Sequence, residues 1–181
     1  MQVFSRLVID CNRRPDVASS IPEISETTAI PGNHNLTQAQ REARRNEIFD
    51  PYHAAIAAEI AARRARGRPT IYIAMHSFTP VFKGRARPMH VAVLYNRNPS
   101  LSQALARLLR REPGLVVAEN EPYSVSDDTD YGVPVHAERA GLDYVEMEIR
   151  QDLIADEAGQ AAWSARLANL LPAALANLDR R

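Results

Sequence analysis

The sequence has only one cysteine, Cys11, so no disulfide can form within the chain. No apolar run reaches the ~20 residues that a membrane-spanning helix needs, and the first residues do not have the pattern of a signal peptide. Lys83 is the only lysine among 22 basic residues, and 22 acidic residues balance them, so no net charge points to nucleic acid. We therefore expect a cytoplasmic protein that binds neither a membrane nor nucleic acid.

The chain is long enough for one domain with one hydrophobic core. Its 181 residues are 45% hydrophobic and 24% charged, which is ordinary for a globular protein. Short apolar segments alternate with segments of helical periodicity, and the apolar segments lie near residues 3–9, 70–75, 90–95, 115–118 and 142–149. Strands that alternate with helices in this way predict an α/β fold with a largely parallel or mixed central sheet.

Helix signals separate the expected strands. Thr37 and Gln40 have the spacing of a capping box at a helix start, and Asp50-Pro51 breaks or restarts that helix. Further helical segments begin near residues 100, 134 and 157. Residues 15–36 hold several prolines among polar residues, so we expect a long irregular loop there.

Four polar segments end or follow the expected strands. They are residues 10–13, 76–79, 120–123 and 146–150. Ligands bind beyond the carboxyl ends of the strands in α/β sheets, so a site is expected at these segments. An amide hydrolase needs a Lewis acid, a carboxylate base and a cation for the substrate carboxylate. His76, Glu148 and Arg13 could supply one of each.

Six short segments resemble the N-formylglutamate amidohydrolase family and occur in the family's order over nearly the whole chain. They are IDCNRRP, PYHAAI, MHSFTP, VLYNR, NEPYS and EMEIRQDL. The resemblance implies a relationship to zinc carboxypeptidases and aspartoacylase, and hence a single family domain over residues 1–181 with a three-layer, zinc carboxypeptidase-like (phosphorylase/hydrolase-like) α/β fold. It also implies a deformylase-type activity in histidine catabolism. In that reaction the N-formyl or another N-acyl amide of glutamate, or of a related amino acid, is hydrolysed to formate and the free amino acid.

The resemblance also implies roles for individual residues. His76 matches the histidine that follows the central strand and binds zinc, and Glu148 matches the glutamate that acts as the general base. Arg150 lies two residues later on the same strand face, where it would hold a second carboxylate or position Glu148. The substrate-binding residues would be Asp10, Asn12, Arg13 and Ser77. We expect Asn12, Arg13, His76 and Glu148 to lie together at one edge of the sheet.

One part of the family pattern is absent from this sequence. Relatives carry the first two zinc ligands, a histidine and an acidic residue, upstream of the segment that matches IDCNRRP, and the present chain starts just before that segment. It contains no His-x-x-Glu and no His-x-His pair. We therefore expect an N-terminally truncated copy that lacks the first strand region, with the remaining ligands of zinc or another divalent metal upstream. The chain should therefore not bind zinc tightly and should show little or no deformylase activity, and its open sheet edge could recruit a second copy.

Simpler interpretations of the same residues remain open. Asp10 and Arg13 could form an ion pair that only anchors their loop, His76 could be a hydrogen-bonded histidine at a strand end, and Glu148 could pair with Arg150 structurally. Glu146 shares the strand face of Glu148 and is a rival base. His53 is expected to be structural, bonding the Asp10 loop.

Two other classes of function also remain open. A catalytically inactive remnant could still bind carboxylate ligands or a protein partner. A nucleic-acid-binding domain could use the arginines of residues 63–68 together with Lys83, Arg85 and Arg87, although the balanced charge argues against it. Small-molecule hydrolysis is the interpretation that the motifs favour.

Overall fold

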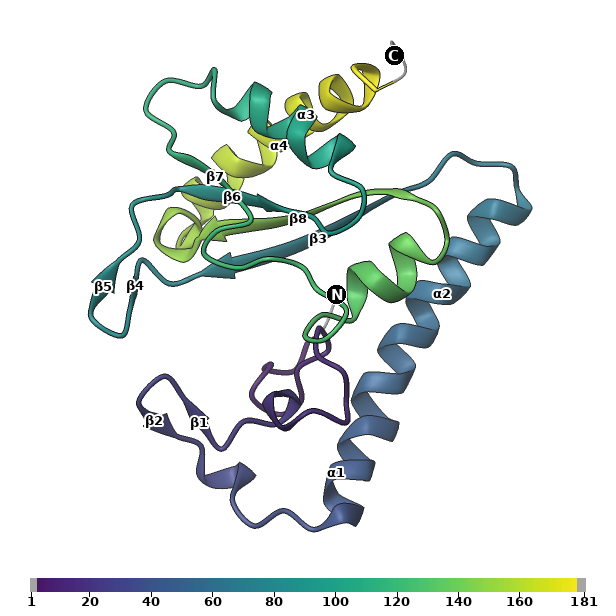
Figure 1. Cartoon of the computed structure of the whole chain (residues 1–181), viewed down its shortest axis with the longest axis vertical. Helices are drawn as coiled ribbons and strands as arrows, with labels where there is room; N and C mark the ends of the chain where they lie inside the picture. Colours follow the sequence, from purple (N-terminus) through teal and green to yellow (C-terminus); the bar gives the residue numbers. More distant parts are fainter. Residues whose placement is uncertain (1–2, 179–181) are drawn as a thin grey trace. The chain divides into compact units, whose positions relative to one another are not determined.

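The computed structural model describes residues 3–178 and divides them into two compact units (Figure 1). Unit 1 comprises the described residues up to Thr70 together with Ser126–Ala140, and unit 2 comprises Ile71–Val125 and the described residues from Gly141 on. Across this described part, none of the helices combines the length and the apolar composition that crossing a membrane requires. The single family domain over the whole chain stays a prediction.

Unit 2 is built on a four-stranded mixed sheet in the order β3-β8-β6-β7. β3 runs parallel to β8, β6 runs antiparallel to β8, and β7 runs parallel to β6. The strands are β3 (Ile71–Phe78), β6 (Val91–Leu94), β7 (Val117–Glu119) and β8 (Asp143–Arg150). The mixed α/β class and the strands expected after residues 70, 90, 115 and 142 are confirmed.

Two helices of unit 2 cover one face of this sheet, as Figure 1 shows. They are α3 (Ser100–Leu109) and α4 (Glu157–Ala176). Val145, Met147 and Ile149 of β8 are buried against them, together with Leu105 and Trp163. Because side chains alternate along a strand, Glu146, Glu148 and Arg150 face the opposite side. The three-layer, zinc carboxypeptidase-like arrangement stays a prediction.

A small hairpin follows the carboxyl end of β3. It consists of β4 (Val81–Phe82) and β5 (Arg85–Ala86), which pair antiparallel around Lys83 and Gly84. Both turn residues have positive φ, 48° for Lys83 and 73° for Gly84, as the tight turns of short hairpins require. The hairpin carries basic and aromatic side chains beyond the end of the strand that bears His76.

Unit 1 contains a continuous helical stretch over residues 38–65, and a short π-helical segment over Val133–Glu138 near the helix start expected at residue 134. The predicted capping box is confirmed, because the Gln40 backbone N–H donates to Thr37 Oγ1 and the Gln40 side chain accepts from the Thr37 N–H. The predicted break at Asp50-Pro51 is wrong, because a π-helical segment joins the two parts and no side chain caps the second, although a new α-helical part does begin at Asp50. The elements are α1 (Gln38–Arg44), the π-helical segment Arg45–Phe49 and α2 (Asp50–Ala65).

The strand expected over residues 3–9 is wrong. These residues form turns, and side chains rather than a neighbouring strand satisfy two of their backbone carbonyls. Asn33 Nδ2 donates to the Leu7 carbonyl oxygen and Arg44 Nη1 donates to the Val8 carbonyl oxygen, each at 2.8 Å. An apolar, β-prone segment becomes a strand only where another strand completes its hydrogen bonds.

The expected irregular loop of residues 15–36 contains short regular pieces. β1 (Ile24–Ser25) and β2 (Thr28–Ala29) form a two-residue ladder, and single 3-10 turns cover Ala18–Ser20 and Pro31–Asn33. Asn33 is buried, and its Nδ2 also donates to the Pro22 carbonyl oxygen at 2.6 Å. The segment is therefore held by specific side-chain bonds, although it contains no long element.

Candidate metal centre

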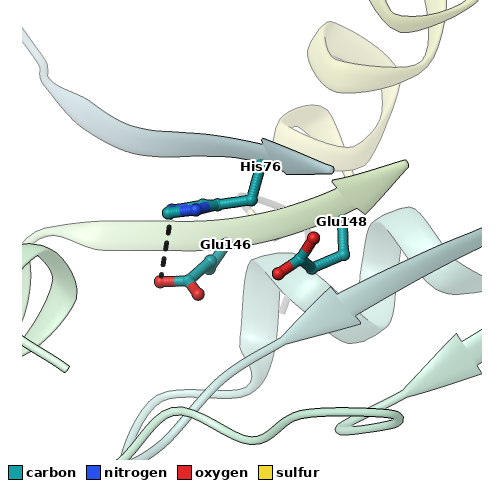
Figure 2. Close-up of side chains that lie close together, drawn as sticks. All are labelled: His76, Glu146 and Glu148. Atoms are coloured by element: carbon teal, nitrogen blue, oxygen red, sulfur yellow. Dashed lines mark ion pairs between the residues drawn. The ribbon is translucent and has the colours of Figure 1, made fainter. Parts of the chain in front are cut away.

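Three potential metal ligands meet on the face of the unit 2 sheet that α3 and α4 leave uncovered. His76 on β3 and Glu146 and Glu148 on β8 each offer one ligand atom, and these atoms lie within 4.8 Å of one another. Figure 2 shows the three side chains converging from the two neighbouring strands. The structure thus brings together His76 and Glu148, as expected, and adds Glu146.

The strand register accounts for this convergence. β3 and β8 are parallel, and His76 is the direct partner of Glu148, so the two side chains project from the same face. Glu146 lies two residues earlier on β8 and therefore shares that face. Its Oε2 lies 3.9 Å from His76 Nε2. Two adjacent strands thus hold a nitrogen donor and two carboxylates in place.

The electrostatics of the cluster favour a cation. Glu146 is only 2% exposed and Glu148 only 6%, and two neighbouring carboxylates repel each other when both are ionised. A divalent ion between them would remove that repulsion. One imidazole nitrogen and two carboxylate oxygens also fit zinc, which takes about three protein ligands in catalytic sites. The sequence signal for Glu146 was the Glu-x-Glu alternation on a strand, which indicated a rival base and not a donor.

Two predicted site residues of unit 2, Arg150 and Ser77, are engaged elsewhere or point away from the three potential metal ligands. Arg150 forms a two-point pair with Asp152, with Nε–Oδ1 at 2.7 Å and Nη2–Oδ2 at 3.1 Å, and its Nη1 donates to backbone carbonyls of residues 87–89. Ser77 is the register partner of Ile149, so it projects to the face of β3 opposite His76. Arg150 therefore ties β8 to the segment after the hairpin, and alternation separates Ser77 from the three donors.

An apolar pocket of about 480 Å³ lies on that opposite face. Met75, Ile149, Trp163 and Leu167 contribute to its lining, together with other residues of α4 and the turn before it. The lining contains no charged residue, histidine or cysteine. The pocket is therefore separate from the candidate metal centre.

In unit 1, Asn12 anchors its own loop to residues 130–132. Its Nδ2 donates to Asp130 Oδ1 at 3.1 Å, and its Oδ1 accepts from the backbone N–H groups of Tyr131 and Gly132 at 3.3 and 2.9 Å. Asp10 is buried and accepts from the Asn12 backbone N–H at 2.9 Å. The predicted substrate-binding segment is therefore a rigid turn, and both ends of the Asn12 amide are engaged in it.

Arg13 is held at the same turn. Its Nη1 donates to the Thr129 carbonyl oxygen at 2.9 Å and lies 3.5 Å from Asp130 Oδ1, while its Nε lies 3.9 Å from Asp10 Oδ2. Arg6 forms a second ion pair with Asp10. The loop-anchoring pair that the sequence left open is present. The convergence of Asn12 and Arg13 with the unit 2 residues stays a prediction.

A buried pair of histidines, His53 and His136, lies against this turn and is hydrogen-bonded to its backbone. His53 Nε2 lies 2.9 Å from the Cys11 carbonyl oxygen and therefore carries the proton, which leaves Nδ1 to accept from His136 Nε2 at 2.8 Å. Phe49 and Tyr131 pack against the His53 ring, with centroids 4.3 and 4.4 Å away. The expected bond between His53 and this loop is confirmed, and its purely structural role stays a prediction.

Burial makes the histidine pair sensitive to acid. Desolvation lowers the pKa of His53 to about 4, with the nearby His136 adding to the effect and the Cys11 carbonyl opposing it, and desolvation also lowers the pKa of His136. Because the pKa of His53 in the folded protein lies below the unfolded value of about 6.5, the folded state favours the neutral ring. The contribution of this ring to the free energy of unfolding is therefore fully present above pH ~6.5 and is lost as the pH falls toward ~4. We expect His53 to contribute roughly 3 kcal/mol to that loss.

Urea unfolding between pH 7.5 and 4, followed by circular dichroism, measures this loss. His53→Gln should be less stable than the wild type at pH 7.5 and should show a flatter pH dependence, because glutamine does not titrate. His34→Gln is the matched control, because His34 is exposed and lies beside Glu23 outside the pair. An unchanged slope in His53→Gln would show that other groups cause the acid sensitivity.

Comparisons with known proteins identify a family and two similar solved structures. A family model described as N-formylglutamate amidohydrolase matches residues 1–155. The solved structure of gene product Atu2144 from Agrobacterium tumefaciens is similar, with a TM-score of 0.91 and 39% identity over 97% of this chain and 69% of that one. An N-formylglutamate amidohydrolase from Ralstonia eutropha JMP134 shares the fold, with a TM-score of 0.55 and 23% identity over 83% of this chain and 63% of that one. No match was found among curated proteins.

Proposed function

The chain belongs to the N-formylglutamate amidohydrolase family, a family of amide hydrolases, and on this premise we propose that it hydrolyses the N-formyl amide of glutamate or of a related amino acid. The observation that carries the proposal is the cluster of His76, Glu146 and Glu148 on one face of the sheet. A buried set of one nitrogen and two carboxylate donors suits metal-assisted hydrolysis of an amide.

We assign the metal donors to His76 and Glu146 in the first place. These two side chains approach each other to 3.9 Å, and Glu146 is the more deeply buried of the two glutamates. A divalent metal held here would polarise the amide carbonyl and lower the pKa of a bound water. Further ligands would complete the set, and Glu148 would lie beside the metal without binding it.

Glu148 is proposed as the general base. Its carboxylate would accept a proton from the water that attacks the formyl carbon, and would then deliver that proton to the amide nitrogen as the carbon–nitrogen bond breaks. Water and amide are consumed, and formate and the free amino group are formed. The direct register with His76 holds Glu148 beside the metal donors throughout.

The turn of unit 1 is proposed to recognise a substrate carboxylate. Arg13 would make the contact, because a guanidinium binds a carboxylate through two parallel hydrogen bonds. Asp10 and Asn12 would position it, because their side chains are engaged in holding the turn.

A carboxylate-binding protein without turnover is the second candidate. In that case the three donors would hold no metal under turnover conditions. The chain would bind an N-acyl amino acid, or a second copy at its sheet edge, without cleaving anything.

The test is direct. Residues 1–181 are produced, incubated with one equivalent of zinc and dialysed, and the metal content and the release of formate from N-formylglutamate are measured. The hydrolase proposal expects retained metal and formate in step with free glutamate. A parallel assay of acetate and free glutamate released from N-acetylglutamate identifies the acyl group. Neither metal nor formate, with N-formylglutamate still bound, would support the second candidate.

A further inference from the structure

Arg87 lies in an aromatic frame at the base of the β4–β5 hairpin. Its guanidinium carbon is 4.6 Å from the ring centroid of Phe82, 5.1 Å from that of Tyr123 and 5.9 Å from that of Phe78. Cation–π contacts hold a guanidinium in one orientation and shield it partly from water. Arg87 is half-buried, whereas Lys83 and Arg85 on the same hairpin are exposed.

Only one nitrogen of this guanidinium is engaged. Arg87 Nη1 donates to the Tyr123 hydroxyl at 3.0 Å and approaches Thr79 Oγ1 at 3.5 Å. Within residues 3–178, Nε and Nη2 donate to no other residue. These two nitrogens form the edge of a guanidinium that can donate two parallel hydrogen bonds to a carboxylate. The aromatic rings therefore hold in place an edge of Arg87, Nε and Nη2, that can donate two hydrogen bonds to one anion; this edge is called the fork below.

The fork lies on the same face of the sheet as the candidate metal centre. Phe78 follows His76 by two residues on β3 and is the register partner of Arg150, so its ring shares the face of His76 and Glu148. Two residues of strand span roughly 7 Å. The Arg150 side chain also donates to the Arg87 carbonyl oxygen, which fixes this segment relative to β8. A small acyl amino acid can reach from the metal donors to Arg87.

The charges around the fork select an anion. The hairpin segment of residues 79–88 contains Lys83, Arg85 and Arg87 and no acidic residue. Arg150, which the sequence suggested for a second carboxylate, already donates from all three nitrogens within unit 2. Arg87, by contrast, lies on the face of the candidate metal centre and keeps two nitrogens for a new two-point contact.

We propose that Arg87, framed by Phe78, Phe82 and Tyr123, binds a carboxylate of the substrate beside the metal centre and so selects acidic N-acyl amino acids. This inference rests on the proposed function for the identity of the substrate. The carboxylate site itself can be tested without any turnover. Arg87 would then be a specificity-determining residue that the family resemblance did not indicate.

The binding test uses glutarate, a dicarboxylate with no amide to cleave, and its neutral analogue glutaramide, measured by calorimetry on the zinc-incubated protein. Arg87→Gln should weaken glutarate binding by about 10- to 100-fold, because it removes a charge-assisted contact, and should leave glutaramide binding unchanged. Arg85→Gln is the matched control, since it removes an exposed cation from the same hairpin and should change glutarate binding less than about threefold, as expected for a screened surface charge.

Arg87→Lys separates recognition from packing. It keeps a cation over the aromatic rings but lacks the fork, so glutarate binding should still fall by several-fold; this variant decides the matter if Arg87→Gln does not fold. Wild-type affinity for glutarate in either folded variant, or no glutarate binding by the wild type, overturns the proposal. Glutarate binding that depends on Arg87 without any formate release would uphold the carboxylate site and refute the hydrolase proposal, so the two failures are distinguishable.

Discussion

Replacing Glu148 by glutamine lowers kcat for formate release by about 10²- to 10⁴-fold, while the metal content stays at the wild-type level. Glutamine has nearly the same shape as glutamate but cannot accept the proton of the attacking water. The loss should fall mainly on kcat with a modest change in KM, because proton transfer occurs only in the transition state. Steady-state kinetics with parallel metal analysis measures both quantities.

The control for this substitution is Glu47→Gln, which neutralises an exposed carboxylate in the π-helical segment of unit 1 and should leave kcat unchanged. If Glu148→Gln loses the metal as well as the activity, Glu148 is a ligand and the base must be sought elsewhere. If Glu146→Gln keeps the metal and loses kcat, the two glutamates have exchanged roles, which is the alternative that the Glu-x-Glu pattern left open.

Replacing His76 by alanine, or Glu146 by glutamine, should reduce retained zinc by about tenfold or more and reduce formate release in proportion. Even groups that only orient a ligand change metal affinity by about 10- to 100-fold when they are mutated, so loss of a donor should cost at least as much. Dialysis against a buffer of fixed free zinc, followed by elemental analysis, gives the occupancy. Added zinc should restore part of the activity, because the defect lies in affinity.

His34→Ala serves as the control for this second experiment, because His34 is an exposed histidine next to Glu23 and far from the cluster in sequence. It should retain wild-type zinc. Full metal occupancy in both His76→Ala and Glu146→Gln would show that the metal is held by other residues, and the cluster would then be a structural pairing of strand-end side chains.

Much of the fold follows from short-range features of the sequence. The strands after residues 70 and 90 were recognisable as short apolar runs, and the strand after residue 142 by its alternation of apolar and charged side chains. The start of α1 was recognisable because Thr37 and Gln40 have the spacing of a capping box. The strand expected at residues 3–9 is wrong because local composition does not determine which groups take the backbone hydrogen bonds. Its composition suits a strand, but Asn33 and Arg44 take its carbonyls.

The candidate site was only partly accessible in this way. Alternation along β8 placed Glu146 and Glu148 on one face, and the family resemblance pointed to His76 and Glu148. Neither feature predicts which strand lies beside β8. The pairing of β8 with β3 is what places Glu146 next to His76. Likewise, nothing local distinguished Arg150, which the structure engages with Asp152, from Arg87, which the structure frames with aromatic rings.

The sequence by itself therefore determined the family, the class of fold, the helix starts and the side-chain types available for catalysis, because periodicity, capping and motif order are properties of neighbouring residues. The tertiary structure alone decided which of those side chains meet. Strand register, the partner of each arginine and the bonds that hold the Asp10 turn depend on residues far apart in the chain. Their contacts exist only after long-range pairing has been paid for in chain entropy.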